Sequence, residues 1–228
     1  MDNQNRYAAL EQEIEYTFRD KQHLEIAFTH TSYANERMVG KLQSYERYEF
    51  LGDAILEFIS SEYLYENYPE LPEGKLTKVR ASLVCEFTLS KIARELGLGQ
   101  LGYFSKGEIK TGGRNRDSIL CDMFESLLGA IYLDGGMDAA KAFAKKYLLN
   151  DIEHKQRFYD SKTTLQEYAQ KKGSKITYEI LSEGGTDHNP IFEAACKMGE
   201  KRLASGKGHS KKSAEQDAAF NALQLLNL

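Results

Sequence analysis

Two groups of carboxylates inside apolar helical segments constrain this chain more than any other feature. In the first group, acidic side chains recur every three or four residues and therefore lie on one stripe of a helix. The second group is an Asp-x-x-Glu pair on one face of another predicted helix, whose expected N-cap is Ser118 or Asp117. The stripe consists of Glu46, Glu49, Asp53 and Glu57, and the pair is Asp122 and Glu125.

The apolar residues around the stripe favour a cation site over an ordinary solvated face. Phe50, Leu51, Ile55, Leu56 and Ile59 cover most of the helix circumference. Like charges at this spacing cost about 0.2–0.5 kcal/mol per pair in water, and burial increases the repulsion unless a cation neutralises it. A solvated stripe and an unrelated acidic pair are the alternative. Oxygen ligands without a nearby His or Cys predict a hard cation, Mg²⁺ or Mn²⁺, rather than zinc.

Composition indicates a globular protein without a membrane segment. Of the 228 residues, 41% are hydrophobic and 28% are charged, and no apolar run is long enough to cross a bilayer. The polar, acidic N-terminus is unlike a secretory signal. Cys85, Cys121 and Cys196 have no zinc-site spacing and are expected to be reduced thiols, which predicts a cytoplasmic location.

The chain divides into two regions with different patterns. Residues 1–150 have helical periodicity interrupted by glycine and proline, among them Gly74 and Gly135-Gly136, which predicts an all-helical domain. Residues 151–160 are polar and are expected to form a linker, or a helix tail leading into a hinge. Residues 161–228 have the pattern α-β-β-β-α. The net charge of −4 hides a difference, because acidic residues predominate in the first region and basic residues in the last.

Several of these segments resemble bacterial ribonuclease III. The sequence ERYEFLGDAIL at 46–56 is similar to the family signature, and DSILCDMFESLLGAIYLDGG at 117–136 is similar to its second catalytic segment. In the last region, KTTLQEYAQ at 162–170, GTDHNP at 185–190 and GKGHSKKSAEQDAA at 206–219 resemble a double-stranded-RNA-binding domain. The expected fold is therefore a helical endonuclease domain followed by a small α+β RNA-binding domain.

The resemblance implies a metal-dependent endoribonuclease that cleaves double-stranded RNA with staggered cuts. It implies 5′-phosphate and 3′-hydroxyl ends, substrates among ribosomal RNA precursors and structured transcripts, and a homodimer with one active site per strand. The implied catalytic residues, which would also bind Mg²⁺ or its substitute Mn²⁺, are Glu49, Asp53, Asp122 and Glu125. Glu46 and Glu73 match further acidic positions, but Glu46 could instead pair across a dimer interface and Glu73 could be a helix-start acid.

A lysine pair near the C-terminus predicts phosphate binding. If Ser210 caps the last helix, Lys211 and Lys212 lie in its first turn, where a cation opposes the helix dipole and an anion is favoured. A solvated lysine pair is the alternative. Recognition of duplex RNA uses two minor grooves and the phosphates between them. By resemblance, the minor-groove contacts are Gln166, Gln170 and His188, and the phosphate contacts are Lys207, Lys211 and Lys212.

Two other functions remain open at this point. A double-stranded-RNA-binding dimer without cleavage activity would use the helical region only for association, but it would have no reason to retain four mutually repelling carboxylates. A helical phosphohydrolase of small nucleotides would leave the RNA-binding pattern unexplained, and the His-Asp metal spacing of such enzymes is absent from the sequence.

Overall fold

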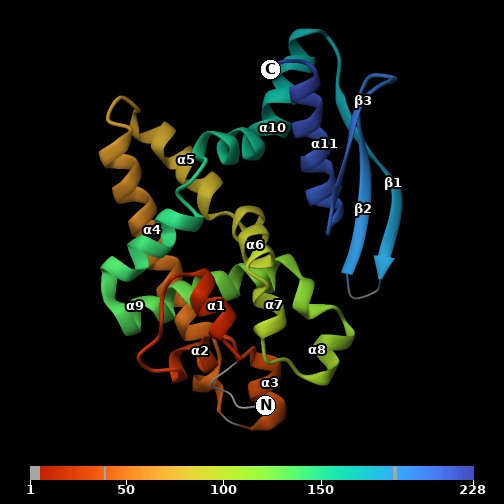
Figure 1. Cartoon of the computed structure of the whole chain (residues 1–228). Coiled ribbons are helices and arrows are strands. Elements are labelled where there is room, and N and C mark those ends of the chain that lie inside the picture. Colours follow the sequence, from red (N-terminus) through yellow and green to blue (C-terminus); the bar gives the residue numbers. More distant parts are fainter. Residues whose placement is uncertain (1–5, 39, 187–188) are drawn as a thin grey trace. The chain divides into compact units, whose positions relative to one another are not determined.

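The computed structural model describes residues 6–38, 40–186 and 189–228 of the chain. The chain divides into two compact units, Met1–Asn150 and Asp151–Leu228, and each is described by itself. The first unit is helical, and the second combines a three-stranded sheet with two helices, as predicted (Figure 1). Within the described ranges, no helix is long and apolar enough to cross a membrane.

The first unit is built around two long helices that pack along each other, α4 and α9. Its described residues contain no β-strand, and Thr29 and Tyr103 form an isolated β-bridge. The α-helices are α1 (Ala8–Glu13), α2 (Gln22–Ala27), α3 (Thr31–Arg37), α4 (Glu46–Asn67), α5 (Glu73–Val84), α6 (Glu86–Glu95), α7 (Leu98–Leu101), α8 (Lys106–Lys110) and α9 (Asp117–Tyr147).

Apolar side chains from α4 and α9 form the centre of this unit. Leu56 and Ile59 of α4 and Met123, Phe124 and Leu127 of α9 are almost completely buried. These apolar positions recur with the helical period and so share one face of each helix. When that face is buried, the carboxylates of α4 and α9 lie at the edge of the helix pair.

A glycine interrupts the regular geometry of α9. Gly136 has φ 78° and ψ −173°, so two helical segments meet at a kink there. Glycine adopts this backbone conformation without the steric penalty of a Cβ. The break predicted at Gly135-Gly136 is therefore confirmed, whereas Gly74, which was expected to interrupt a helix, lies inside α5.

The second unit has the predicted order α-β-β-β-α. The strands form an antiparallel sheet in the order β1-β2-β3, with Tyr178 opposite Cys196 and Cys196 opposite Ala204. Both helices pack on one face of the sheet through a core that includes Leu165, Cys196 and Leu223. The elements are α10 (Ile152–Lys171), β1 (Ile176–Thr186), β2 (Asn189–Met198), β3 (Lys201–Gly208) and α11 (Lys211–Leu225).

The segment 151–160, which was expected to be a linker or a helix tail, forms most of the first half of α10. Phe158 packs against Phe220 of α11 with 5.2 Å between the ring centroids. The side-chain amide of Gln216 donates hydrogen bonds to the carbonyls of Phe158 and Tyr159 at 2.6 and 3.1 Å. Two apolar residues, Ile152 and Phe158, are buried on an otherwise polar segment, which explains why composition alone indicated a linker.

Candidate active site and RNA-binding surface

The backbones of α4 and α9 touch at the predicted catalytic residues. A Cβ on Gly52 would lie 1.8 Å from the main-chain oxygen of Glu125, and a Cβ on Gly129 would lie 2.3 Å from that of Tyr48. Both helices need glycine there, because any larger residue would force them apart. This close approach places Glu49 and Asp53, which flank Gly52 on α4, near the carboxylates of α9.

The carboxylates of α4 and α9 lie close enough to interact electrostatically. Burial raises the pKa of Glu125 to about 8, and the charges of Asp53, Asp122 and Glu49 add to the effect. Burial raises the pKa of Glu49 to about 7, with further contributions from Asp122, Glu46 and Asp53. Burial and these neighbouring charges therefore make Glu49 and Glu125 harder to ionise. We refer to Glu49, Asp53, Asp122 and Glu125 as the acidic seam.

Tyr45 supports one member of the acidic seam. Its hydroxyl donates a hydrogen bond to Asp122 Oδ2 at 3.0 Å, and its side chain is 4% exposed. Burial raises the pKa of Asp122, while this hydrogen bond lowers it by stabilising the charged form. Tyr45 was not among the site residues predicted from the sequence. The available signal was its position one helical turn before Glu49, immediately before the acidic stripe.

The expectation that no sulfur ligand lies near the carboxylates was wrong. Cys121 Sγ lies 3.9 Å from Glu125 Oε1, and the ligand atoms of Cys121, Asp122 and Glu125 all lie within 4.8 Å of one another. Cys121 and Glu125 are four residues apart on α9, so their side chains share one face. The local donor set thus contains a thiol as well as oxygen atoms.

The two accessory candidates lie on exposed surfaces. Glu46 is exposed in the first turn of α4, and its charge contributes to the raised pKa of Glu49. Glu73 is the first residue of α5, is exposed, and accepts a hydrogen bond from Thr77 Oγ1 at 2.9 Å. Glu57, at the end of the stripe, forms an ion pair with Arg80 at 2.7 Å.

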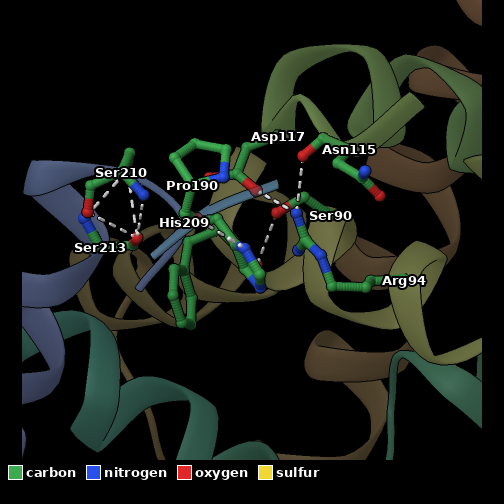
Figure 2. Close-up of polar contacts among 9 residues, drawn as sticks. Ser90, Arg94, Asn115, Asp117, Pro190, His209, Ser210 and Ser213 are labelled. Carbon is green, nitrogen blue, oxygen red and sulfur yellow. Dashed lines mark hydrogen bonds and ion pairs between the residues drawn. The ribbon is translucent and has the colours of Figure 1, made fainter. Parts of the chain in front are cut away.

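The start of α9 is fixed by an ion pair rather than by the expected side-chain cap. The N-cap residue is Arg116, which makes no side-chain capping bond, and Asp117 is the first helical residue. Arg94 Nη2 of α6 contacts Asp117 Oδ1 at 2.8 Å and donates to the carbonyl of Asn115 at 2.9 Å (Figure 2). The prediction that Asp117 or Ser118 caps this helix was therefore wrong. Asp117 in the first turn is still stabilised by the helix dipole, whose positive end lies there.

The acidic seam fits a hard divalent cation. It offers carboxylate oxygens, the ligands that Mg²⁺ and Mn²⁺ prefer. Burial and the charges of neighbouring carboxylates raise the pKa values of Glu49 and Glu125, and a positive charge would favour their ionised forms. Such a site can bring a cation and a phosphodiester together, which is the requirement for hydrolysis of a nucleic acid.

On the second unit, most of the predicted RNA contacts are exposed. Gln166 and Gln170 lie one turn apart on the exposed face of α10. Lys207 is exposed on β3, and Lys211 and Lys212 are exposed in the first turn of α11. His188 lies outside the described residues.

The beginning of α11 is rigidly capped, as predicted. Ser210 Oγ accepts a hydrogen bond from the backbone N–H of Ser213 at 3.1 Å, and Ser213 Oγ accepts one from the N–H of Ser210 at 3.0 Å (Figure 2). The ring of His209 lies 3.2 Å from the carbonyl of Pro190, which joins this turn to β2. The two lysines thus project from a fixed helix start.

Glycines in β3 allow α11 to lie against the sheet. A Cβ on Gly206 would lie 2.1 Å from the backbone nitrogen of Ala218, and a Cβ on Gly208 would lie 2.1 Å from Ser213 Oγ. The Gly-x-Gly that precedes the lysine pair therefore serves packing.

Two family profiles together match most of the chain. The ribonuclease-III-like profile matches residues 20–152, and the double-stranded RNA binding motif matches residues 161–226. Together they define the class of protein as an endoribonuclease that acts on double-stranded RNA.

Individual relatives agree with the profiles. The chain is 47% identical to "Ribonuclease 3" of Limosilactobacillus fermentum over 205 residues, covering 89% of this chain and 88% of the relative. It is 45% identical to "Ribonuclease 3" of Streptococcus sanguinis, with 97% of each chain covered. A solved nuclease domain of ribonuclease III from Campylobacter jejuni has a TM-score of 0.58 and 40% identity, and the match covers 62% of this chain and 95% of that one. The chain belongs to the ribonuclease III family.

Proposed function

We propose that the acidic seam is the catalytic site and that it binds Mg²⁺, with Mn²⁺ able to replace it. The observation that carries this proposal is the backbone contact of α4 with α9 at Gly52, beside which burial and neighbouring carboxylates raise the pKa values of Glu49 and Glu125. When bound, divalent cations supply activation of water and neutralisation of charge on the phosphate. Products with 5′-phosphate and 3′-hydroxyl ends are the corresponding expectation.

The protein residues have distinct roles in this proposal. Glu49 and Asp53 would hold the cation from α4, and Asp122 and Glu125 would hold it from α9. All four would bind it as charged carboxylates, the form that binds metal. Tyr45 keeps Asp122 oriented through its hydroxyl. Glu46 and Glu73 are proposed as accessory residues.

The second unit is proposed to hold the duplex. Its exposed lysines, Lys207, Lys211 and Lys212, are assigned to phosphates, and Gln166 and Gln170 to a minor groove. His188 is assigned to the next minor groove. The proposed boundaries are residues 1–150 for the catalytic and dimerisation domain and 161–228 for the RNA-binding domain, with 151–160 joining them.

We also propose a homodimer formed through α4. Phe50 is 80% exposed, and Phe58 and Tyr65 follow it along the same helix with 52% and 77% exposure. Large apolar side chains in such a row are typical of an association surface. The related nuclease domain from Campylobacter jejuni shows structural flexibility in a region involved in dimer formation. A two-fold arrangement would place one acidic seam on each strand of a duplex, which gives staggered cuts.

The proposed setting is processing of ribosomal RNA precursors and structured transcripts in the cytoplasm. The three cysteines are free thiols, as expected for a reducing compartment. A duplex-binding dimer without cleavage activity is not favoured, because the four carboxylates of a nuclease are present and interact.

The test is digestion of a long perfect RNA duplex. Cleavage into short duplexes is expected with Mg²⁺, and no cleavage is expected with EDTA. Single-stranded RNA of the same sequence and free nucleotides should compete poorly, which excludes a phosphohydrolase of small nucleotides. Digestion of the products by an exonuclease that requires a 5′-phosphate reports the chemistry of the ends. An uncut duplex in the presence of Mg²⁺ would contradict the proposal.

A further inference from the structure

The face of α9 that carries the acidic seam also carries a thiol that hard-cation binding does not use. Cys121 is half-buried, and its sulfur lies 3.9 Å from Glu125 Oε1. The sulfur and the carboxylate oxygens of Asp122 and Glu125 lie within 4.8 Å of one another. Cys121 and Glu125 are one turn apart, and Asp122 is adjacent to Cys121, so one rigid helix presents all three groups.

The chemistry of these three donors differs from that of an oxygen-only site. Mg²⁺ has little affinity for sulfur, whereas Zn²⁺ and Cd²⁺ bind thiolate strongly and also accept carboxylate oxygens. Zn²⁺ adopts tetrahedral coordination, so three protein donors leave one position for water. The separations between these ligand atoms are short enough for small movements to bring them onto one ion.

We propose that Cys121, Asp122 and Glu125 form a site for a thiophilic divalent cation of the Zn²⁺ type, which inhibits the enzyme by occupying two carboxylates of the acidic seam. The thiol proton leaves to solvent as the sulfur–metal bond forms, with no change in oxidation state. The inhibitory part of this inference rests on the proposed function, since it requires Asp122 and Glu125 to act in catalysis. The binding part does not.

The other two cysteines do not share this arrangement. Cys85 Sγ contacts the carbonyl of Ser82 at 3.5 Å and Thr88 Oγ1 at 3.4 Å. It lies near enough to Cys121 to act on it electrostatically, yet it is not part of the three-donor group. Cys196 is fully buried in the core of the second unit. Cys85→Ser is therefore a matched control, because it removes a neighbouring thiol and leaves the three donors in place.

The first experiment measures binding without reference to catalysis. Cd²⁺ is titrated into the full-length wild-type protein and the Cys121→Ala and Cys85→Ser variants, and the ultraviolet thiolate-to-metal charge-transfer absorption is recorded. We expect the absorption to saturate at one Cd²⁺ per chain in the wild type and in Cys85→Ser and to be lost in Cys121→Ala. An unchanged signal in Cys121→Ala, or no signal in the wild type, would overturn the inference. Cys121→Ser replaces Cys121→Ala if circular dichroism shows that the latter is unfolded.

The second experiment measures inhibition. Zn²⁺ is titrated into duplex-RNA cleavage reactions at fixed Mg²⁺, with each protein compared with its own rate in Mg²⁺ alone. Removing Cys121 should raise the Zn²⁺ concentration for half-inhibition by at least about tenfold. Loss of a residue that only supports a metal ligand already lowers metal affinity by about 10- to 100-fold, and Cys121 would be a ligand itself. Equal Zn²⁺ sensitivity in both proteins would contradict the inhibitory site. Absence of cleavage in every Mg²⁺ reaction would instead contradict the proposed function, while the Cd²⁺ titration would still decide the binding site.

Discussion

Gly52 of α4 lies so close to Glu125 of α9 that a Cβ at position 52 would be 1.8 Å from the main-chain oxygen of Glu125. The acidic seam therefore depends on the absence of a side chain as much as on its carboxylates. Because the obstructing atom belongs to the backbone of a buried helix, no side-chain rotation could make room for a methyl group.

Gly52→Ala should separate α4 from α9 and disrupt the seam. Overpacking at this contact is expected to lower the free energy of unfolding by about 2–3 kcal/mol or more, with a large loss of duplex cleavage. Thermal unfolding and cleavage rates measure the two effects. Gly74→Ala in α5, where a Cβ would meet no atom within 4 Å, is the matched control. It should be neutral or stabilise by up to about 1 kcal/mol. Equal effects of the two substitutions would contradict the importance of the close contact.

Tyr45→Phe should weaken cation binding with little change in packing. The ring stays in place edge-on to His30, 5.5 Å between centroids, and only the hydroxyl that donates to Asp122 is lost. We expect a higher Mg²⁺ concentration for half-maximal cleavage and a stability change of about 1 kcal/mol.

Tyr48→Phe provides the comparison for this prediction. Its hydroxyl lies 3.0 Å from His23 Nδ1, so the substitution removes a similar contact near the same end of α4 without touching Asp122. Cleavage with Tyr48→Phe should need no more Mg²⁺ than the wild type. If both variants shift the Mg²⁺ requirement equally, the hydroxyl of Tyr45 has no specific role.

Much of this architecture could be predicted from local patterns in the sequence. The spacing of Glu49, Asp53, Asp122 and Glu125 follows the helical period, so it predicts the shared faces before any tertiary contact is known. The same holds for Ser210, whose type and position mark a helix start. These features depend on neighbours three or four residues away in the chain.

Features that depend on distant contacts could not be predicted in this way. Tyr45 meets Asp122 across 77 positions, and Arg94 meets Asp117 across 23. The helical start of α10 also depends on a distant contact. The polar composition around Phe158 suggests a linker, but Phe158 packs against Phe220 of α11. Cys121 was overlooked for a different reason, since a single cysteine lacks the spacing that marks a metal site in sequence.

The stability of the metal-free protein should fall as the pH rises. Glu49 and Glu125 have pKa values of about 7 and about 8, above the ordinary value of 4.5, so the folded state binds more protons than the unfolded state. The free energy of unfolding therefore decreases between about pH 4.5 and about pH 8. Mg²⁺ should raise the melting temperature, and more strongly at the upper end of this range, because binding requires the charged carboxylates.

Thermal unfolding in EDTA and in Mg²⁺ across this pH range tests the prediction. Glu125→Gln should show a smaller fall in stability with pH, since it removes the group with the higher pKa. Glu73→Gln, at the exposed start of α5, is the control and should keep the full fall. A pH dependence that is the same in both variants would show that the seam does not contain the groups responsible.

Lys211→Ala and Lys212→Ala should each weaken duplex binding and make it less sensitive to salt. Each phosphate contact that is lost should reduce the slope of log affinity against log salt by about 1. Fluorescence anisotropy with a short RNA duplex at several salt concentrations provides the measurement. Lys197→Ala removes a lysine that is ion-paired with Glu179 on the sheet and should leave the slope unchanged. An identical slope in all four proteins would contradict the assignment of the lysine pair to phosphates.

The most direct test of the catalytic role of the acidic seam is the Glu125→Gln variant on a long RNA duplex. The substitution keeps the size of the side chain and removes its charge. Mg²⁺-dependent cleavage is predicted to fall by more than about a hundredfold. Loss of a residue that only supports a metal ligand lowers activity by about 10- to 100-fold, and Glu125 is proposed to be a ligand itself. Duplex binding, measured in the same buffer, should stay within error of the wild type. Cleavage at the wild-type rate by a folded Glu125→Gln protein would contradict the assignment of the acidic seam as the active site.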